Sequence, residues 1–157
     1  MAVELLEAPA TLVRKSWSPP RPRTVETTGR LEIPVETATG EERVALEHTL
    51  PQYMRGAYLQ RVKSYEKSAH RAFPIPYERV RYLRDFRIHG ITRGNFTVVF
   101  FHAMDGEEYR EGVGFAKRSL DSPRIERGTS IAFYRAMDDL IRGMAFQVLE
   151  SGNGSGS

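Results

Sequence analysis

The chain has 157 residues with a formal net charge of +3, 27% of them charged and none of them cysteine. This length suits one compact domain with tails, and the lack of cysteine excludes disulfide bonds and thiolate metal sites. No stretch approaches the roughly 20 apolar residues of a membrane-spanning helix, and the first residues, MAVELLEAPATLV, lack the basic region of a signal peptide. We therefore expect a cytoplasmic protein with no membrane partner.

Positive charge is concentrated in residues 53–93. This stretch holds ten of the 23 Lys and Arg residues against three acidic residues, a surplus of seven positive charges. Five of the seven tyrosines lie in or beside it: Tyr53, Tyr58, Tyr65, Tyr77 and Tyr82. Cationic and flat aromatic side chains together are typical of surfaces that bind polyanions, so nucleic acid is the first partner to consider. A solvated helix face that binds nothing remains the alternative.

Residues 1–48 are expected to form an extended, proline-rich arm. Five of the nine prolines lie in the first 34 residues, several of them beside Trp17, and proline interrupts helices and central strands. If the arm is ordered, Trp17 is the residue expected to anchor it. Apolar residues alternate over 31–35, which predicts a short strand that Pro34 confines to a sheet edge. Such an arm could cross the domain or pair with another chain.

The folded domain is expected over residues 49–150 and opens with a helix. Thr49 and Gln52 have the spacing of a capping box, and Pro51 suits the first helical turn. Apolar residues then recur at three- and four-residue spacing to about Ala72, while most basic residues fall off that stripe. The basic block is therefore expected to be mostly one exposed helix face.

Three antiparallel strands are expected after the Pro-Ile-Pro break that ends this helix. The first covers Arg81–Ile91 and turns at Thr92–Asn95 into an apolar central strand over Phe96–Phe101. Asp105-Gly106 is the strongest hairpin signal in the chain, because this dipeptide tolerates positive φ. A third strand then runs from Tyr109 to Lys117.

The third strand and a last helix are expected to pack closely. One face of the strand carries only small residues: Gly112, Gly114 and Ala116. The helix is expected to begin after Pro123 or at Gly128 and to end near Leu149. Its predicted sheet-facing residues are Phe133, Met137, Leu140, Ile141, Met144 and Val148.

The predicted fold class is α+β, in the order helix, three-stranded antiparallel sheet, helix (α-β-β-β-α), preceded by the extended arm. Residues 151–157 contain only Gly, Ser and Asn, a composition typical of a flexible tail. They are therefore left out of the predicted domain.

Two motifs carry a resemblance to a known fold. The run Gly112–Lys117, GVGFAK, is similar to a glycine-rich third strand that ends in lysine, and Ile131–Met137, IAFYRAM, is similar to an alanine-bearing helix that covers such a strand. With the order of elements over about Pro51–Leu149, these resemble the double-stranded-RNA-binding-domain fold, and the last half resembles the N-terminal domain of small-subunit ribosomal protein five. Small bacteriophage proteins with a Gly-x-Ala strand and an Ile-Ala-x-x-Arg-Ala helix are also similar.

The sequence departs from that resemblance at both RNA-binding regions. RNA-binding members open the last helix with a lysine cluster, whereas here the basic residues around Arg124 are diluted by Asp121 and Glu126. Those members also insert the loop between the first two strands into the minor groove. Here that loop, residues 89–95, is short, and Arg93 and Asn95 are its only expected readers of a base. The dilution of the basic residues near the last helix puts phosphate binding there in doubt.

The predicted function is that of a small non-enzymatic protein that binds nucleic acid, DNA or RNA, or regulates the machinery that handles it, transcription included. The alternative is a phage-type protein-binding inhibitor of a host enzyme such as RNA polymerase. In that case the basic block of this chain would bind an acidic surface of the enzyme. The residues expected to contact nucleic acid are Arg55, Arg61, Lys63, Lys67, Arg71, Arg93, Lys117 and Arg118. Tyr53, Tyr77 and Tyr82 are the tyrosines left free to stack on a base.

The four histidines are the only side chains suited to acid-base chemistry at neutral pH, and none has the spacing of a metal motif. A hairpin that turns at Thr92–Asn95 predicts His102 opposite Asp85, with Tyr109 nearby, a set that an enzyme could use. A cross-strand hydrogen bond is the more common outcome of such a placement. We therefore expect no catalytic residue, no metal and no cofactor.

Overall fold

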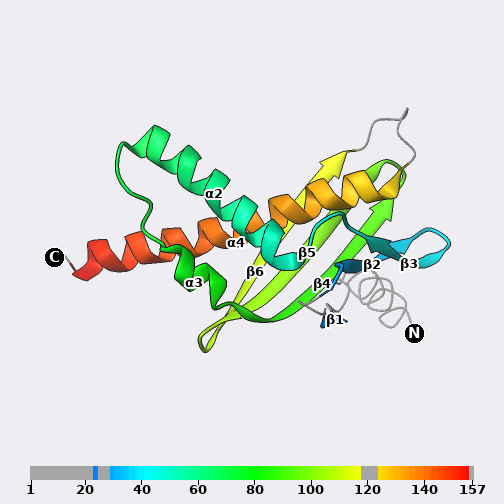
Figure 1. The fold of residues 1–157 in the computed structure, drawn as a ribbon, viewed down its shortest axis with the longest axis horizontal. Coiled ribbons are helices and arrows are strands. Elements are labelled where there is room, and N and C mark those ends of the chain that lie inside the picture. The colour runs from blue at the N-terminus through cyan, green and yellow to red at the C-terminus, as the bar shows by residue number, and fades with distance from the viewer. Residues whose placement is uncertain (1–22, 25–28, 118–123, 156–157) are drawn as a thin grey trace, which may run out of the picture.

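The computed structural model describes residues 23–24, 29–117 and 124–155, which form a twisted sheet with helices on one face (Figure 1). The elements in chain order are β1 (Arg23–Thr24), β2 (Glu32–Thr37), β3 (Gly40–Ala45), α2 (Leu50–Ala69), α3 (Tyr77–Arg81), β4 (Arg84–Arg93), β5 (Phe96–Asp105), β6 (Glu108–Lys117) and α4 (Ile125–Ser155). The fold is therefore α+β, as expected.

The sheet is mixed and has the order β3-β2-β4-β5-β6, with β1 paired to a separate part of β4. Strand β2 runs parallel to β4, with Val35 opposite Gly90, and the other pairs are antiparallel. The predicted three-stranded antiparallel sheet was therefore wrong. The strands it lacked come from the segment that was expected to be an extended arm, because the hairpin of β2 and β3 supplies one side of the sheet.

The prediction that the strand at 31–35 lies at a sheet edge was also wrong, since β2 lies between β3 and β4. Pro34 is buried and stands opposite Arg43 of β3. The ladder between β2 and β4 contains only Val35 and Glu36, so Pro34 lies just outside it. An inner strand can thus contain a proline at a position that is not hydrogen-bonded to one of its two neighbouring strands, here β4.

Helix α2 begins with the predicted capping box. The backbone N–H of Gln52 donates to Oγ1 of Thr49 at 3.4 Å, and the N–H of Thr49 donates to Oε1 of Gln52 at 2.9 Å. The helix ends at Ala69, and His70 follows in the left-handed region with a φ of 56°. Helix α3 was not predicted, and strand β4 begins after it.

Both hairpin turns lie where they were predicted, although the first contains only Gly94 and Asn95 rather than the four residues 92–95. The turn between β4 and β5 has Gly94 at a φ of 61°, and the turn between β5 and β6 has Gly106 at 63°. Glycine takes these left-handed conformations without the steric cost that a Cβ would add.

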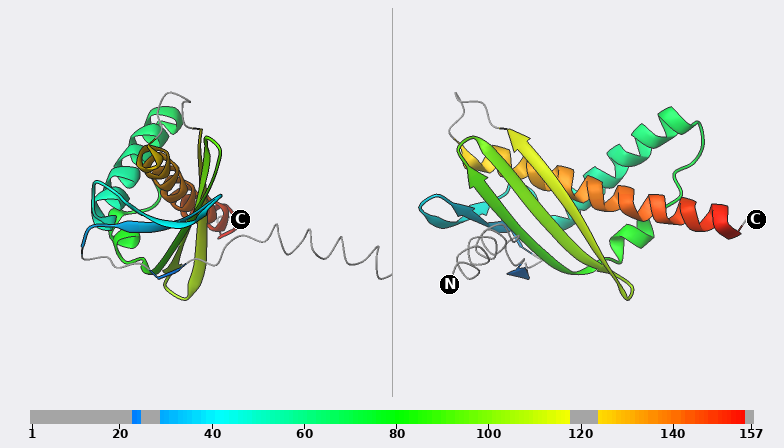
Figure 2. Two further views of the ribbon diagram at one scale, coloured as in Figure 1. Left: turned by 90° about the vertical axis from the view of Figure 1, so that its right-hand side faces the viewer. Right: turned by 180° about the vertical axis from the view of Figure 1, so that it is seen from behind.

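Helix α4 lies in backbone contact with β6. A Cβ built on Gly114 would stand 1.9 Å from the carbonyl oxygen of Ala132, and one built on Gly112 would stand 2.0 Å from that of Ala136. The predicted close packing of strand and helix is therefore confirmed. In the end-on view of Figure 2, α4 lies between the sheet and α2. It continues past Leu149 to Ser155, and residues 156–157 lie outside the described part.

The core fills the space between the sheet and the two long helices. Its largest fully buried side chains are Leu31, Ile33, Leu46, Leu50, Ile75, Ile88, Phe101, Phe133, Met137, Leu140, Ile141 and Met144. Five of the six residues predicted to face the sheet from the last helix are in this set, and the sixth, Val148, is partly buried against it. The two strands of the β2–β3 hairpin contribute to the same core as the later strands.

Candidate nucleic-acid interface

The outward face of α2 carries three of the predicted contact residues. Arg55, Lys63 and Lys67 are exposed, and their spacing of eight and four residues places them on one side of the helix. At a rise of 1.5 Å per residue they extend over about 18 Å. Arg71 lies exposed just beyond the helix end, and Glu66 is the only acidic residue in α2. We call Arg55, Lys63, Lys67 and Arg71 the α2 cationic stripe.

Two members of the stripe are held by aromatic side chains rather than by acids. The guanidinium carbon of Arg55 lies 6.0 Å from the centroid of the Tyr77 ring, within the range of a cation–π contact. Nε of Arg71 donates to the hydroxyl of Tyr65 at 3.0 Å. Across residues 29–117 and 124–155, no salt bridge involves a member of the stripe. Its positive charge is therefore open to an external anion.

Arg61 lies on the other side of α2 and binds Asp138 of α4. Its Nε and Nη2 donate to the two carboxylate oxygens, each at 2.7 Å, in a bidentate ion pair. The hydrogen bond to Asp138 raises the pKa of Arg61, so the guanidinium stays charged. This pair fastens α2 to α4 and leaves Arg61 outside the cationic stripe.

Arg93 and Lys117 lie on the sheet, away from α2. Both stand opposite Phe96, Arg93 from β4 and Lys117 from β6. Successive residues of a strand point to opposite faces, so Lys117 projects from the face opposite the one where Gly114 meets α4. Arg93 is also paired with Glu36, with 3.3 Å between Nη2 and Oε1. The structure does not bring these two residues together with the α2 stripe, and Arg118 lies outside the described residues.

The three tyrosines expected to be free for stacking differ in exposure. Tyr53 is buried and its hydroxyl lies 3.2 Å from Oγ of Ser130, while Tyr77 is partly buried and packs against Tyr58. Only Tyr82, at the end of α3, is open, with 77% of its surface exposed. Helical period could have placed Tyr53 on the buried side, because it follows Leu50 by three residues and precedes Ala57 by four, and both of these are buried.

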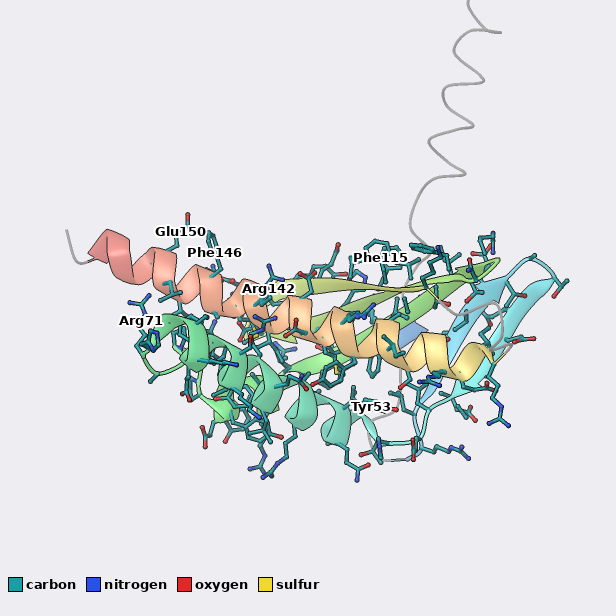
Figure 3. The ribbon with its side chains drawn as sticks, turned by 90° about the horizontal axis from the view of Figure 1, so that it is seen from above. Tyr53, Arg71, Phe115, Arg142, Phe146 and Glu150 are labelled. Atoms are coloured by element: carbon teal, nitrogen blue, oxygen red, sulfur yellow. The ribbon has the colours of Figure 1, made fainter. Side chains whose placement is uncertain are left out.

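Arg142 was missed by the sequence reasoning. It is exposed on α4 and lines a hollow between the C-terminal halves of α2 and α4, with a volume of about 390 Å³. Figure 3 shows Arg142 on α4 and Arg71 near the end of α2. The helical period of α4 places Arg142 off the apolar stripe, and this period could have predicted from the sequence that Arg142 is exposed. Most of the hollow is apolar, and Phe146 at its rim is 68% exposed.

The predicted pairing of His102 with Asp85 was wrong. His102 stands opposite Arg87, because the ladder of β4 and β5 is regular from Arg93 and Phe96 up to this pair and the turn between the strands contains only Gly94 and Asn95, two residues fewer than predicted. The register shifts only beyond this pair, between Arg84 and Arg87. Asp85 has a φ of 55° in that irregular stretch, and its carboxylate pairs with Arg84 at 2.6 Å. A turn two residues shorter than expected moves each cross-strand partner by two positions, and the spacing of residues in the sequence does not reveal the length of the turn.

His102 instead contacts residues of β6. Its Nδ1 contacts the hydroxyl of Tyr109 and lies 3.8 Å from Oε2 of Glu111. Burial lowers the pKa of His102, Glu111 opposes that shift, and Arg87 adds to it. The ring is thus held in a cross-strand contact.

The lowered pKa predicts a pH dependence of stability. The unfolded chain takes up a proton on His102 near pH 6.5 and the folded chain does so only at lower pH, so the free energy of unfolding falls as pH drops through this range. Urea midpoints at about pH 7.5 and 5 should show a smaller fall for His102→Gln than for the wild type. Equal falls in the two proteins would contradict the lowered pKa.

Among residues 23–24, 29–117 and 124–155, no group of three or more His, Asp or Glu residues could hold a metal ion. In the same ranges, no helix is both long enough and apolar enough to cross a membrane. Comparison of the chain with protein-family models, with curated proteins and with solved structures found no match.

Proposed function

We propose that the protein binds nucleic acid, without acting on it as an enzyme, through the α2 cationic stripe. The observation that carries this proposal is the exposure of Arg55, Lys63, Lys67 and Arg71 beside a single acidic residue of α2, with no salt bridge to any of the four among the described residues. Cations that lack an internal partner are free to replace the counterions of a polyanion.

The size of the stripe suits a short length of nucleic acid. Its helical part extends over about 18 Å, and a duplex rises about 3.4 Å per base pair, so the stripe would follow about five base pairs. Contacts of this kind go to phosphates and carry no sequence information. We therefore expect binding without base specificity through this surface.

The attachment of α2 to α4 supports the proposal, because it holds the stripe in one orientation. The hydroxyl of Tyr134 lies 3.1 Å from the carbonyl oxygen of Gly56 and 2.9 Å from Oε1 of Gln60. Together with the bidentate pair of Arg61 and Asp138, these contacts attach residues 56–61, the first half of the helix segment that bears the stripe, to α4. A surface that is already ordered loses less entropy when it binds.

Salt dependence of binding tests the proposal. Fluorescence polarisation with a labelled duplex and with a labelled single strand, for DNA and for RNA, would be measured between about 50 mM and 200 mM salt. Three phosphate contacts would weaken duplex binding by about 40-fold over this range. Lys67→Glu should lower the affinity and reduce the salt slope by about one unit. Absent or salt-insensitive binding would contradict the proposal.

Arg43→Glu is the matched control for Lys67→Glu. It changes the net charge equally, and Arg43 is exposed on β3, at the end of the molecule far from the C-terminal end of α2 (Figure 1). The control should keep the wild-type salt slope. If both variants lose affinity equally, binding follows net charge and the α2 stripe is not the site.

A second candidate function is that of a protein-binding regulator, such as an inhibitor of a host enzyme of the RNA polymerase class. The apolar hollow between α2 and α4, with exposed Phe146 at its rim, favours this candidate, because exposed apolar surface commonly marks a protein contact. Capture of one protein partner before and after nuclease treatment, lost in Phe146→Ala, would favour it over nucleic-acid binding.

A further inference from the structure

An apolar patch lies on the sheet face opposite α4. Phe96 of β5 and Phe115 of β6 are 48% and 53% exposed, and their ring centroids lie 6.2 Å apart in an edge-to-face arrangement. Val98 stands opposite Phe115 and is partly buried. We call Phe96, Val98 and Phe115 the outer patch. In the rear view of Figure 2, β4, β5 and β6 lie in front of α4.

The edge of the sheet beside the outer patch is closed to strand addition at two backbone groups. The N–H of Val113 donates to Oδ2 of Asp139 at 3.0 Å, and Arg135 donates to the carbonyl oxygen of Phe115 at 2.7 Å. Both acceptor and donor come from α4 and occupy groups that a further strand would need. A second copy of the chain therefore gains little by pairing at β6.

The position of β1 limits the room beside it within the sheet. Arg23 stands opposite Ile88 of β4 in antiparallel pairing, and Val35 of β2 stands opposite Gly90 on the same side of β4. Residues preceding Arg23 would therefore run into β2 if they stayed in the sheet. Ile33 and Ile88 are fully buried, so the inner face is filled by the core. A path over the outer face meets neither β2 nor the core.

The distance from Arg23 to the outer patch matches the length of the proline-rich segment. Phe115 lies three strand spacings and about three residues along the sheet from Arg23, which amounts to about 17 Å. Trp17 precedes Arg23 by six residues, and three of the residues between them are prolines. An extended proline-rich chain of six residues spans about 19 Å. Trp17 can therefore reach Phe115.

We propose that the outer patch is the docking site of this chain's own residues 1–22, with Trp17 packed against Phe96 and Phe115. Aromatic side chains bury large areas and favour edge-to-face contacts, so Trp17 suits a patch of two such rings. A proline-rich connection is already extended and loses little entropy on docking. The proposal is independent of nucleic-acid binding, because the α2 stripe lies on the helical side of the molecule.

Fluorescence of Trp17, the only tryptophan in the chain, tests this docking directly. In the wild-type protein, acrylamide should quench it several-fold less than it quenches free N-acetyltryptophanamide. Phe115→Ser should increase the quenching and shift the emission to longer wavelength. Tyr82→Ser, which alters the exposed aromatic residue of α3, is the control and should change neither property. Quenching of the wild type equal to that of the free compound would overturn the proposal.

A cross-link gives a second measurement that keeps the aromatic residues intact. The chain has no cysteine, so Ser18→Cys combined with Lys117→Cys creates one possible disulfide, near Trp17 and Phe96. It should form within one chain upon mild oxidation, because disulfides need Cα atoms within about 7 Å. Ser18→Cys with Lys63→Cys, on α2, is the control that should not cross-link. A disulfide between chains, or Trp17 protection that rises with concentration, would assign the patch to a second copy and overturn the proposal.

Discussion

Gly114→Ala is expected to lower the free energy of unfolding by about 3 kcal/mol or more, because the added methyl group has no space. A Cβ at this position would lie 1.9 Å from the carbonyl oxygen of Ala132 and 2.4 Å from the backbone nitrogen of Ala136. Both neighbours are helix backbone, so relief requires α4 to move away from β6. Urea denaturation followed by circular dichroism measures the loss.

Gly143→Ala is the matched control on α4 itself. A Cβ at Gly143 meets nothing within 4 Å, so the same substitution should stabilise the helix by about 0.5–1 kcal/mol. Opposite signs for the two variants would show that the clash, and not the loss of glycine as such, determines the result. If Gly114→Ala keeps the wild-type midpoint, α4 does not lie against β6 at the distance described.

Phe133→Ala is expected to cost about 3–5 kcal/mol of stability, since it removes a large side chain from the centre of the core. Phe133 is fully buried, and its ring lies 5.4 Å from that of Tyr53 and 5.6 Å from that of Phe101. These contacts connect α4 to α2 on one side and to β5 on the other. The midpoint of urea denaturation, with the slope checked for two-state behaviour, is the measurement.

Phe146→Ala makes the same change on the same helix at a site that is 68% exposed. Its effect should stay within about 0.5 kcal/mol, because exposed substitutions leave no cavity. A comparable loss for Phe133→Ala and Phe146→Ala would contradict the assignment of Phe133 to the core. If Phe146→Ala is stable, it can also serve in the partner-capture experiment without the complication of unfolding.

The local elements could be predicted from neighbouring residues. The capping box of Thr49 and Gln52, the turns at Gly94 and Gly106, and the small-residue face of β6 each depend on residues a few positions apart. The same reasoning placed Lys67 and the other members of the α2 stripe on the exposed side, since helical period determines which side chains share a face.

The sequence pattern could not predict which residues far apart in the chain are paired. Val35 pairs with Gly90 in parallel, and nothing in the local alternation of β2 distinguishes that partner from an open edge. In the sequence, Arg61 is not distinguished from the other basic residues of α2. Its ion pair depends on Asp138 of α4, which is 77 positions away. The register of β4 and β5 likewise places His102 opposite Arg87 rather than Asp85.

The sequence by itself determined the two long helices, the hairpin turns and the later strands, and which cations of α2 face outward, because these follow from steric preferences and periodicity within a few residues. Only the tertiary structure decided which strands are neighbours and which cations are neutralised, as Arg61 is by Asp138. Those outcomes depend on the free energy of burying a shared core, to which distant segments such as β2 and α4 contribute together.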